Sequence, residues 1–89
     1  MKEEIKKILK NKMSREILIF FYQNQSSIDT VGGVSAWVQS DRKKVKEILD
    51  RLVELGVLEE DSTSSTKAYC YTRNAKIMKV VQGLMKENA

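Results

Sequence analysis

The sequence predicts a single, mainly α-helical domain with one small β-hairpin. Apolar residues recur every three or four positions through several stretches of the chain, which is the spacing of one face of a helix. Near residue 60, a short polar run separates two stretches that are rich in strand-favouring residues. The chain has 89 residues, of which 42% are hydrophobic and none is proline, so it can fill one core but not two.

The amino-terminal part of the chain predicts two helices. Apolar residues keep the helical spacing from Ile5 onward, and the polar Asn11 and Ser14 are both suitable amino-terminal caps. We therefore expect an N-terminal helix over residues 1–12 and a second helix from about Ser14 to Asn24. The segment ILIFF within the second helix has strand propensity, but the polar residues before it and the continuing period favour a helix.

A weaker helix is predicted next, in the segment TVGGVSAWVQ, residues 30–39. The polar segment NQSSID before it lacks periodicity and can run extended, and Thr30 or Asp29 is the expected cap. Gly32 and Gly33 each cost about 1 kcal/mol of helix propensity relative to alanine. This helix therefore depends on tertiary packing, and its two glycines allow a neighbour to lie close.

The strongest helix prediction follows Asp41, which is a good cap. From Val45 to Leu55 the apolar residues form a regular stripe, and Gly56 suits the left-handed position that commonly ends a helix.

The rest of the chain predicts a hairpin and a last helix. The polar run DSTSST joins the segments VLEE and KAYCYT, which we interpret as two strands. Tyr69 and Tyr71 alternate with smaller residues, so one of the two sets should face the core. A C-terminal helix over residues 73–87 follows, with Thr72 or Asn74 as its cap.

Several classes of protein are disfavoured by composition. The chain has no histidine and one cysteine, Cys70, so neither a four-ligand zinc site nor an internal disulfide is expected. It also lacks clustered carboxylates in an apolar setting and a Gly-rich phosphate loop, so we predict a protein that is not an enzyme and needs no cofactor. The longest apolar run, from Ile17 to Tyr22, is too short to span a membrane, and we expect a cytoplasmic protein.

Charge is distributed unevenly along the chain. Residues 1–15 hold six basic and two acidic residues, residues 42–46 hold four basic residues, and residues 62–89 hold five basic and one acidic. Between them, residues 47–61 hold six carboxylates and one cation, Arg51. A polyanionic partner must meet the basic stretches and avoid the acidic one.

Three segments together resemble a known family. VKEILDRLVELGVL, residues 45–58, resembles the recognition-helix signature of MarR-like and ArsR-like regulators of bacteria and archaea, with apolar positions four and seven residues after the first and glycine eleven after it. TVGGVSAWV resembles the helix before it, and YCYTRNA the end of the wing. The resemblance covers about residues 14–76. It implies a winged helix-turn-helix with a three-helix core and β wing over residues 14–72, flanked by additional terminal helices.

That resemblance implies binding of double-stranded DNA by a transcriptional regulator. Four cations crowd the start of the recognition helix, where the helix dipole disfavours positive charge, so folding alone does not explain them. They could neutralise phosphates and reach guanine edges. The alternative explanation of these four cations is that they form an ordinary solvent-exposed face of the helix. Hydroxyls at the wing tip, from Ser62 to Thr66, could meet the backbone, although a hairpin tip without function explains them equally well. The predicted DNA contacts are Thr30, Ser40, Arg42, Lys43, Lys44, Lys46, Thr66 and Lys67.

The same resemblance implies a homodimer. In these families the extra terminal helices pair two copies about a two-fold axis, which spaces the recognition helices by about 34 to 36 Å, one turn of duplex. The expected dimer stripe consists of Ile5, Ile8, Leu9, Met13, Ile77, Val81, Leu84 and Met85.

Two departures from the family pattern favour another reading. Glu47 stands where many DNA-binding members carry a cation, and three acidic residues frame the base of the wing. A module that binds a protein, through Trp37 or the acidic 47–61 region, is therefore the alternative hypothesis. More often such a tryptophan packs its ring against the side of the first helix. RNA binding through the same basic groups is a third, weaker alternative.

Overall fold

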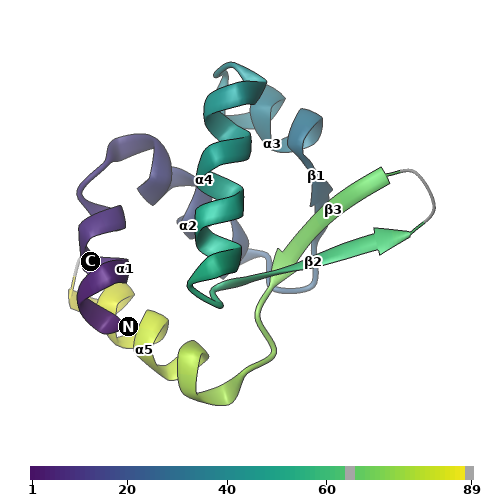
Figure 1. The fold of residues 1–89 in the computed structure, drawn as a ribbon. Helices are drawn as coiled ribbons and strands as arrows, with labels where there is room; N and C mark the ends of the chain where they lie inside the picture. Colours follow the sequence, from purple (N-terminus) through teal and green to yellow (C-terminus); the bar gives the residue numbers. More distant parts are fainter. Residues whose placement is uncertain (64–65, 88–89) are drawn as a thin grey trace.

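The observed elements include five helices and three strands. The structure is a computed structural model that describes residues 1–63 and 66–87. In chain order the elements are α1 (Lys2–Leu9), α2 (Lys12–Gln23), β1 (Ile28–Thr30), α3 (Val31–Val38), α4 (Arg42–Glu54), β2 (Leu58–Thr63), β3 (Thr66–Tyr71) and α5 (Ala75–Glu87). The mainly helical architecture with a hairpin confirms the predicted fold class (Figure 1).

The break between α1 and α2 has two polar contacts. The Asn11 side chain accepts a hydrogen bond from the backbone N–H of Ser14 at 3.0 Å, so Asn11 is the cap. Arg15 donates to the carbonyl oxygen of Leu9 at 2.7 Å, which satisfies the end of α1. The predicted break is confirmed, but α2 begins at Lys12, two residues earlier than expected, because Asn11 rather than Ser14 caps it.

The other predicted caps are also present. Thr30 accepts from Gly33 N at 3.1 Å, and Asn74 accepts from the backbone N–H of Ile77 at 3.2 Å. Gly56 adopts φ +79°, the left-handed conformation expected at the end of α4. A side chain there would place Cβ only 2.8 Å from the end of the Ile77 side chain, so both the backbone and the space favour glycine.

The three strands form one antiparallel sheet in the order β1-β3-β2. Ile28 pairs with Cys70 on one side of β3, and Leu58 pairs with Tyr71 on the other. The sequence predicted only the hairpin, because three extended residues in a polar segment carry too little pattern to mark a strand. With a neighbour on both edges, β3 buries Cys70 as well as Tyr69 and Tyr71.

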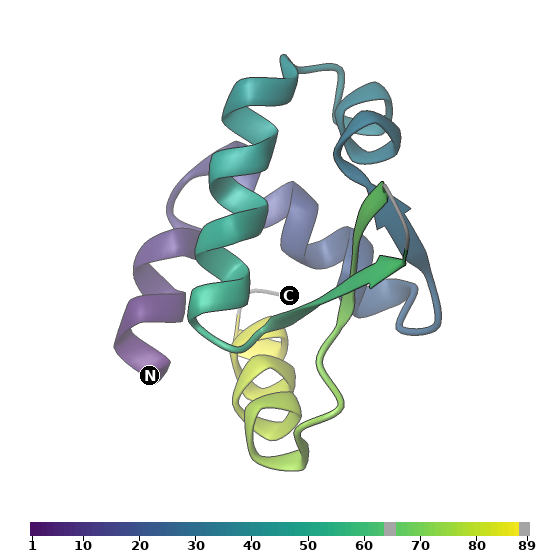
Figure 2. The same cartoon turned by 45° about the vertical axis from the view of Figure 1, so that its right-hand side comes forward.

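One connected core draws residues from all five helices and from β2 and β3. In Figures 1 and 2, α4 stands between the hairpin on one side and α1 on the other, and α5 lies at the lower end of the molecule. The amino terminus of α4 lies at the edge of the molecule in both views, whereas its carboxyl end runs into β2. This arrangement leaves the first turn of α4 at the surface.

Candidate nucleic-acid interface

A tight turn joins α3 to α4 and sets the direction of α4. Gln39 lies in the left-handed backbone region, with φ 56°, and Ser40 N donates to the Ser35 carbonyl oxygen at 3.2 Å. The buried Ser35 hydroxyl donates to the Ser40 carbonyl oxygen. Both bonds connect α3 to the residue just before the cap of α4, so they hold the two helices as one helix-turn-helix unit. Ser40, a predicted DNA contact, therefore also has a structural role through its backbone.

The rotation of α4 about its axis is fixed by its buried face. Val45, Leu49 and Leu52 have no measurable exposure, and they recur at intervals of four and three residues. The Asp41 side chain accepts from Lys44 N at 3.0 Å, which confirms the predicted cap. With one face anchored in the core, the side chains of the first turn must point into solvent.

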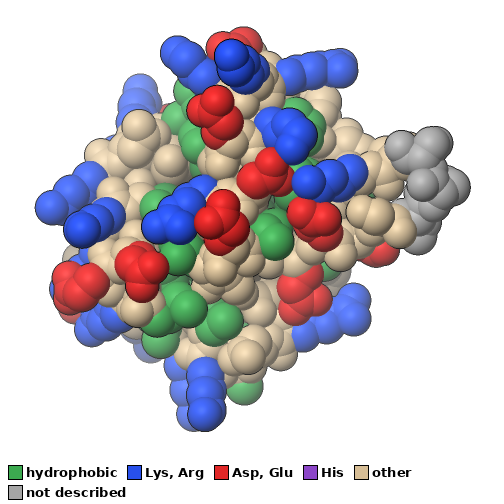
Figure 3. Space-filling model, in the orientation of Figure 1, with side chains coloured by type: hydrophobic (Ala, Val, Ile, Leu, Met, Phe, Trp, Pro, Cys, Tyr) green, Lys and Arg blue, Asp and Glu red, His purple; other side chains and the backbone are tan. Residues whose placement is uncertain are grey.

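The first turn of α4 presents three of the predicted DNA contacts. Arg42, Lys43 and Lys44 are exposed, and none of them forms an ion pair within the described part of the chain. Basic side chains gather at the upper end of the molecule in Figure 3, where α4 begins in Figure 1. Three unpaired cations at a helix amino terminus are each unfavourable by roughly 0.3–1 kcal/mol, so the folded chain alone derives no benefit from them.

Gly32 gives the Arg42 side chain room to lie against α3. A Cβ added at Gly32 would come within 3.2 Å of the Arg42 guanidinium. The sequence predicted that this glycine would allow close approach of a neighbour. The structure identifies the neighbour as the side chain of a candidate DNA contact, which extends along the outer side of the helix pair.

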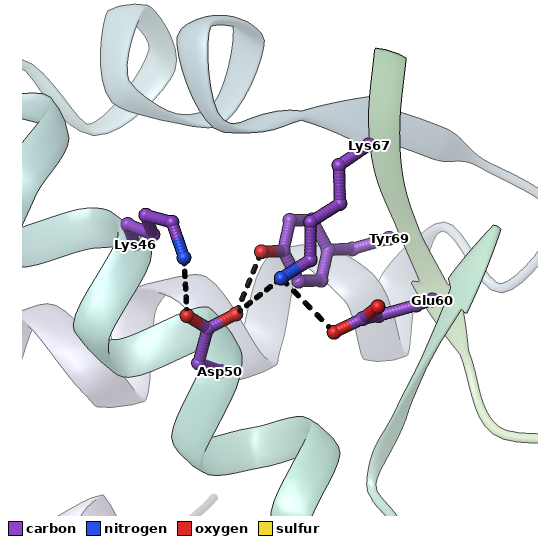
Figure 4. Close-up of polar contacts among 5 residues, drawn as sticks. All are labelled: Lys46, Asp50, Glu60, Lys67 and Tyr69. Carbon is purple, nitrogen blue, oxygen red and sulfur yellow. Dashed lines mark hydrogen bonds and ion pairs between the residues drawn. The ribbon is translucent and has the colours of Figure 1, made fainter. Parts of the chain in front are cut away.

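Lys46 and Lys67, two further predicted contacts, are in a different environment. Both bind the Asp50 carboxylate (Figure 4). The Lys46 ammonium, which lies on α4 like Asp50, is 2.6 Å from it, and the Lys67 ammonium, which comes from β3, is 3.2 Å from it. Lys67 also binds Glu60 of β2 at 3.0 Å, and the Tyr69 hydroxyl donates to Asp50 at 2.7 Å. We call these five residues the Asp50 hub. It connects the middle of α4 to both strands of the hairpin.

The electrostatics of the hub follow from these contacts. The hydrogen bond from Lys46, with those from Tyr69 and Lys67, lowers the pKa of Asp50 from its ordinary 3.8 to about 2. Hydrogen bonds to Glu60 and Asp50 raise the pKa of Lys67. Burial, together with the bond to Asp50, raises the pKa of Tyr69. At neutral pH Asp50 is therefore a carboxylate, Lys67 a cation and Tyr69 a neutral phenol.

From the sequence, Asp50 or Arg51 could be expected to pair with a neighbouring element, and the structure shows that Asp50 does so. The hub as a whole was not predicted, although two signals were present. Lys46 and Asp50 are four residues apart on one helix, a spacing that allows an ion pair. Lys67 and Tyr69 are two residues apart on one strand and so share a face. Only the packing of that face against α4 brings the two pairs together.

The acidic base of the wing also has internal partners. Glu59 accepts a hydrogen bond from the backbone N–H of Arg73 at 2.8 Å, and Glu60 holds Lys67. The contacts of these two carboxylates therefore stabilise the hairpin itself. Thr66, a predicted contact, is exposed at the start of β3, whereas Ser64 and Ser65 lie outside the described residues.

The predicted dimer stripe divides into two groups. Ile5, Leu9, Val81 and Leu84 are buried in the core of the single chain, where α1 packs against α5. The structure therefore assigns these four to packing within the chain, because the two terminal helices are short and cover each other. Ile8, Met13, Ile77 and Met85 are only partly buried.

Two further residues singled out in the sequence are accounted for by packing. Trp37 is 54% exposed, and its ring packs on Phe20 of α2 with centroids 4.8 Å apart. Burial raises the pKa of the Cys70 thiol, which opposes formation of the reactive thiolate.

Residues 1–63 and 66–87 contain no group of acidic, cysteine or histidine side chains able to hold a metal ion. Within the same ranges, every helix is too short or too polar to cross a membrane.

Comparisons with known proteins agree with this geometry. No family model and no curated protein matches the sequence. Among solved structures, HlyU from Vibrio cholerae superposes with a TM-score of 0.70 at 16% identity, covering 92% of this chain and 82% of HlyU. Mb0332 from Mycobacterium bovis, a homodimeric winged helix-turn-helix DNA-binding domain and a possible ArsR-family regulator, gives 0.69 at 18% identity, covering 93% of this chain and 76% of that fragment.

A third similar structure contains DNA. The complex of MepR from Staphylococcus aureus with DNA superposes with a TM-score of 0.70 at 15% identity, covering 97% of this chain and 73% of that chain. MepR is a transcription regulator of the multidrug efflux pump MepA. At such identities the likeness is one of fold, and it confirms that this chain has the winged helix-turn-helix fold of these regulators. The β2–β3 hairpin is the wing, and α4 occupies the place of the recognition helix.

Proposed function

We propose that this protein binds double-stranded DNA sequence-specifically through its winged helix-turn-helix and regulates transcription. The observation that carries the proposal is the first turn of α4, where Arg42, Lys43 and Lys44 are exposed without carboxylate partners among the described residues. The DNA complex of MepR, which has the same fold, supports it.

Each of these side chains has a role that fits its chemistry. Lys43 and Lys44 are compact cations suited to phosphate contacts, whose formation releases counterions. Arg42 can make a bidentate contact with a guanine edge or a phosphate, and it starts from a position beside α3. Thr30, whose oxygen already accepts a bond from Gly33, retains a hydroxyl proton to donate to the backbone. Thr66 would add a contact from the wing.

The salt dependence of binding to random-sequence duplex tests the proposal. Fluorescence anisotropy with a labelled duplex should show binding at low salt that weakens steeply as salt rises, with a log–log slope of about −0.9 for each phosphate neutralised. A protein with no affinity for duplex at low salt would overturn the proposal. Competition with single-stranded and duplex RNA would show whether DNA is preferred.

We further propose that two copies form a homodimer through the side of the molecule that carries α1 and α5. Mb0332, which shares the fold, is a homodimer. The partly exposed members of the predicted stripe, Ile8, Met13, Ile77 and Met85, would meet the partner, while the buried members hold each chain together. Sedimentation at high micromolar concentration should give twice the 10.2 kDa chain mass. A monomer under these conditions would remove the dimer.

A protein-binding module is the second candidate. The half-exposed Trp37 and the exposed Glu47, which lies on the same helix as the cationic turn, are the observations that favour it. Exposed aromatic side chains commonly anchor protein partners. A stable protein partner recovered by affinity capture and lost on Trp37→Ala, together with the absence of duplex affinity, would select this function over DNA binding.

A further inference from the structure

The Asp50 hub joins the recognition helix to the wing through one carboxylate. Asp50 lies about two turns after the start of α4, and its two oxygens accept hydrogen bonds from Lys46, Lys67 and Tyr69 (Figure 4). Lys67 is held a second time by Glu60, and its ammonium lies 5.5 Å from the Tyr69 ring centroid. The only fully buried member is Tyr69, whose ring packs in the core, so the hub has a rigid base.

The hub makes the surface between α4 and the wing electrically neutral. Lys46 and Lys67 are balanced by Asp50 and Glu60, all of which keep a third or more of their side-chain surface exposed. Both lysines are therefore accessible from solvent, so a DNA backbone that approached α4 and the wing could meet them. At the tip of α4 the three cations have no such partners among the described residues.

The hub lysines differ from the tip lysines in what a phosphate contact would require. A lysine of the first turn of α4 has to lose only bound water when it contacts a phosphate. A hub lysine must break bonds to a carboxylate that is already in place, and Lys67 must break bonds to two. Because the number of phosphates that a protein neutralises sets the strength of its sequence-independent binding, two withheld lysines lower that binding.

We propose that Asp50 is a specificity-determining residue that holds Lys46 and Lys67 away from the DNA backbone and fixes the wing against α4. This inference rests on the proposed function. It assigns the sequence-independent contacts with the DNA backbone to the first turn of α4. It also explains why two of the predicted contact lysines form ion pairs within the protein. Asp50 acts through the lysines and the wing, and needs no contact with DNA of its own.

The test compares two substitutions that change the net charge equally. Asp50→Asn keeps the size of the side chain, releases Lys46 and leaves Lys67 held by Glu60 alone. Glu47→Gln removes an exposed carboxylate from the same helix that has no ion-pair partner in the described structure. Binding to random-sequence duplex is measured by anisotropy across a range of salt. For Asp50→Asn the log–log slope should steepen by about 1, since the freed Lys46 adds about 0.9 while Glu60 still holds Lys67. At low salt its affinity should rise about tenfold, while Glu47→Gln should keep the wild-type slope.

Combined substitutions show whether the effect passes through the lysines. Adding Lys46→Gln and Lys67→Gln to Asp50→Asn should return the slope to the wild-type value. In the wild-type background, Lys46→Gln alone should leave the slope unchanged, and this variant also serves if Asp50→Asn does not fold. Circular dichroism verifies the fold of each variant.

The outcomes separate this inference from the proposed function. If the wild-type protein binds duplex but Asp50→Asn behaves like Glu47→Gln, or Lys46→Gln alone flattens the slope by about one, Asp50 does not withhold the lysines. DNA binding itself would still stand in that case. If the wild-type protein does not bind duplex at all, both the inference and the proposed function are overturned.

Discussion

The first turn of α4 and its middle turns contain similar side chains in opposite situations. Arg42, Lys43 and Lys44 are exposed and lack ion pairs in the described structure, although the helix dipole disfavours them. One turn later, Lys46 belongs to the Asp50 hub and is neutralised. In the sequence these four cations form a single cluster. The contrast shows that charge count alone does not define a nucleic-acid surface, because tertiary neighbours decide which charges remain available.

The largest effect, a loss of stability, should come from truncating an apolar side chain that anchors α4 in the core. Leu49 is fully buried in the middle of α4, so Leu49→Ala should lower the free energy of unfolding by about 3 kcal/mol through lost apolar contact and a residual cavity. Urea denaturation measures this value. Glu47→Ala, at an exposed neighbour, should change stability by less than about 0.5 kcal/mol. Equal effects of the two substitutions would contradict the assigned rotation of α4.

Reversing the charge of the first turn should nearly eliminate binding. Lys43→Glu with Lys44→Glu replaces two cations that we propose contact phosphates by anions, and we expect duplex affinity at low salt to fall by about 100-fold or more. Anisotropy gives the affinity. Lys76→Glu with Lys79→Glu makes the same charge change at exposed positions of α5, away from the start of α4, and should have a much smaller effect. Similar losses in both double variants would mean that the first turn has no special role.

Removing the cap of α4 should separate stability from binding. Asp41→Ala deletes the side-chain bond to Lys44 N, so stability should fall by about 1 kcal/mol. The same change removes a carboxylate from the start of the helix that carries the three cations, so duplex affinity should not decrease. Thermal unfolding and anisotropy report the two effects. A parallel loss of affinity and stability would show that the order of the helix start matters more than its charge.

The smallest expected effect is the loss of the hub's contribution to stability at acidic pH. Because the pKa of Asp50 is lowered to about 2 in the folded protein from an ordinary 3.8, its ion pairs contribute stability above about pH 4. That contribution is lost as pH falls from about 4 to 2. With Asp50 33% exposed, solvent screening limits it to about 1 kcal/mol or less. The stability difference between the wild type and Asp50→Asn should therefore shrink between pH 5 and pH 2.5, as followed by urea denaturation. A difference that is constant across this range would show that Asp50 is not stabilised as a carboxylate.

Much of the fold was predictable because its signals are local. Asp41, Thr30 and Asn74 were identified as caps because they are short polar residues that precede apolar periodic segments, and Gly56 because a left-handed residue commonly ends a helix. The edge strand β1 was missed, since three residues carry no period and their pairing with β3 is a long-range contact. The helix boundaries differed by two or three residues where two caps competed.

The candidate site was predictable in part. The sequence marked the cationic start of α4 and its apolar anchor, and the structure confirms that Val45, Leu49 and Leu52 are buried. The sequence grouped Lys46 and Lys67 with Arg42 as DNA contacts. Only the structure shows that both lysines, unlike Arg42, are paired with Asp50. The same holds for Ile5 and Leu9, whose helical spacing is compatible with packing inside one chain or between two.

The sequence by itself determined which segments form helices, where they begin and end to within two or three residues, and which face of each is apolar, because these properties depend on neighbours within a few residues. Tertiary structure alone decided that β3 lies against α4 and that Asp50 meets Lys67 and Tyr69. It also decided that α1 covers α5. The physical reason is that a charge or an apolar stripe can be satisfied by many partners, and only the packed chain selects one of them.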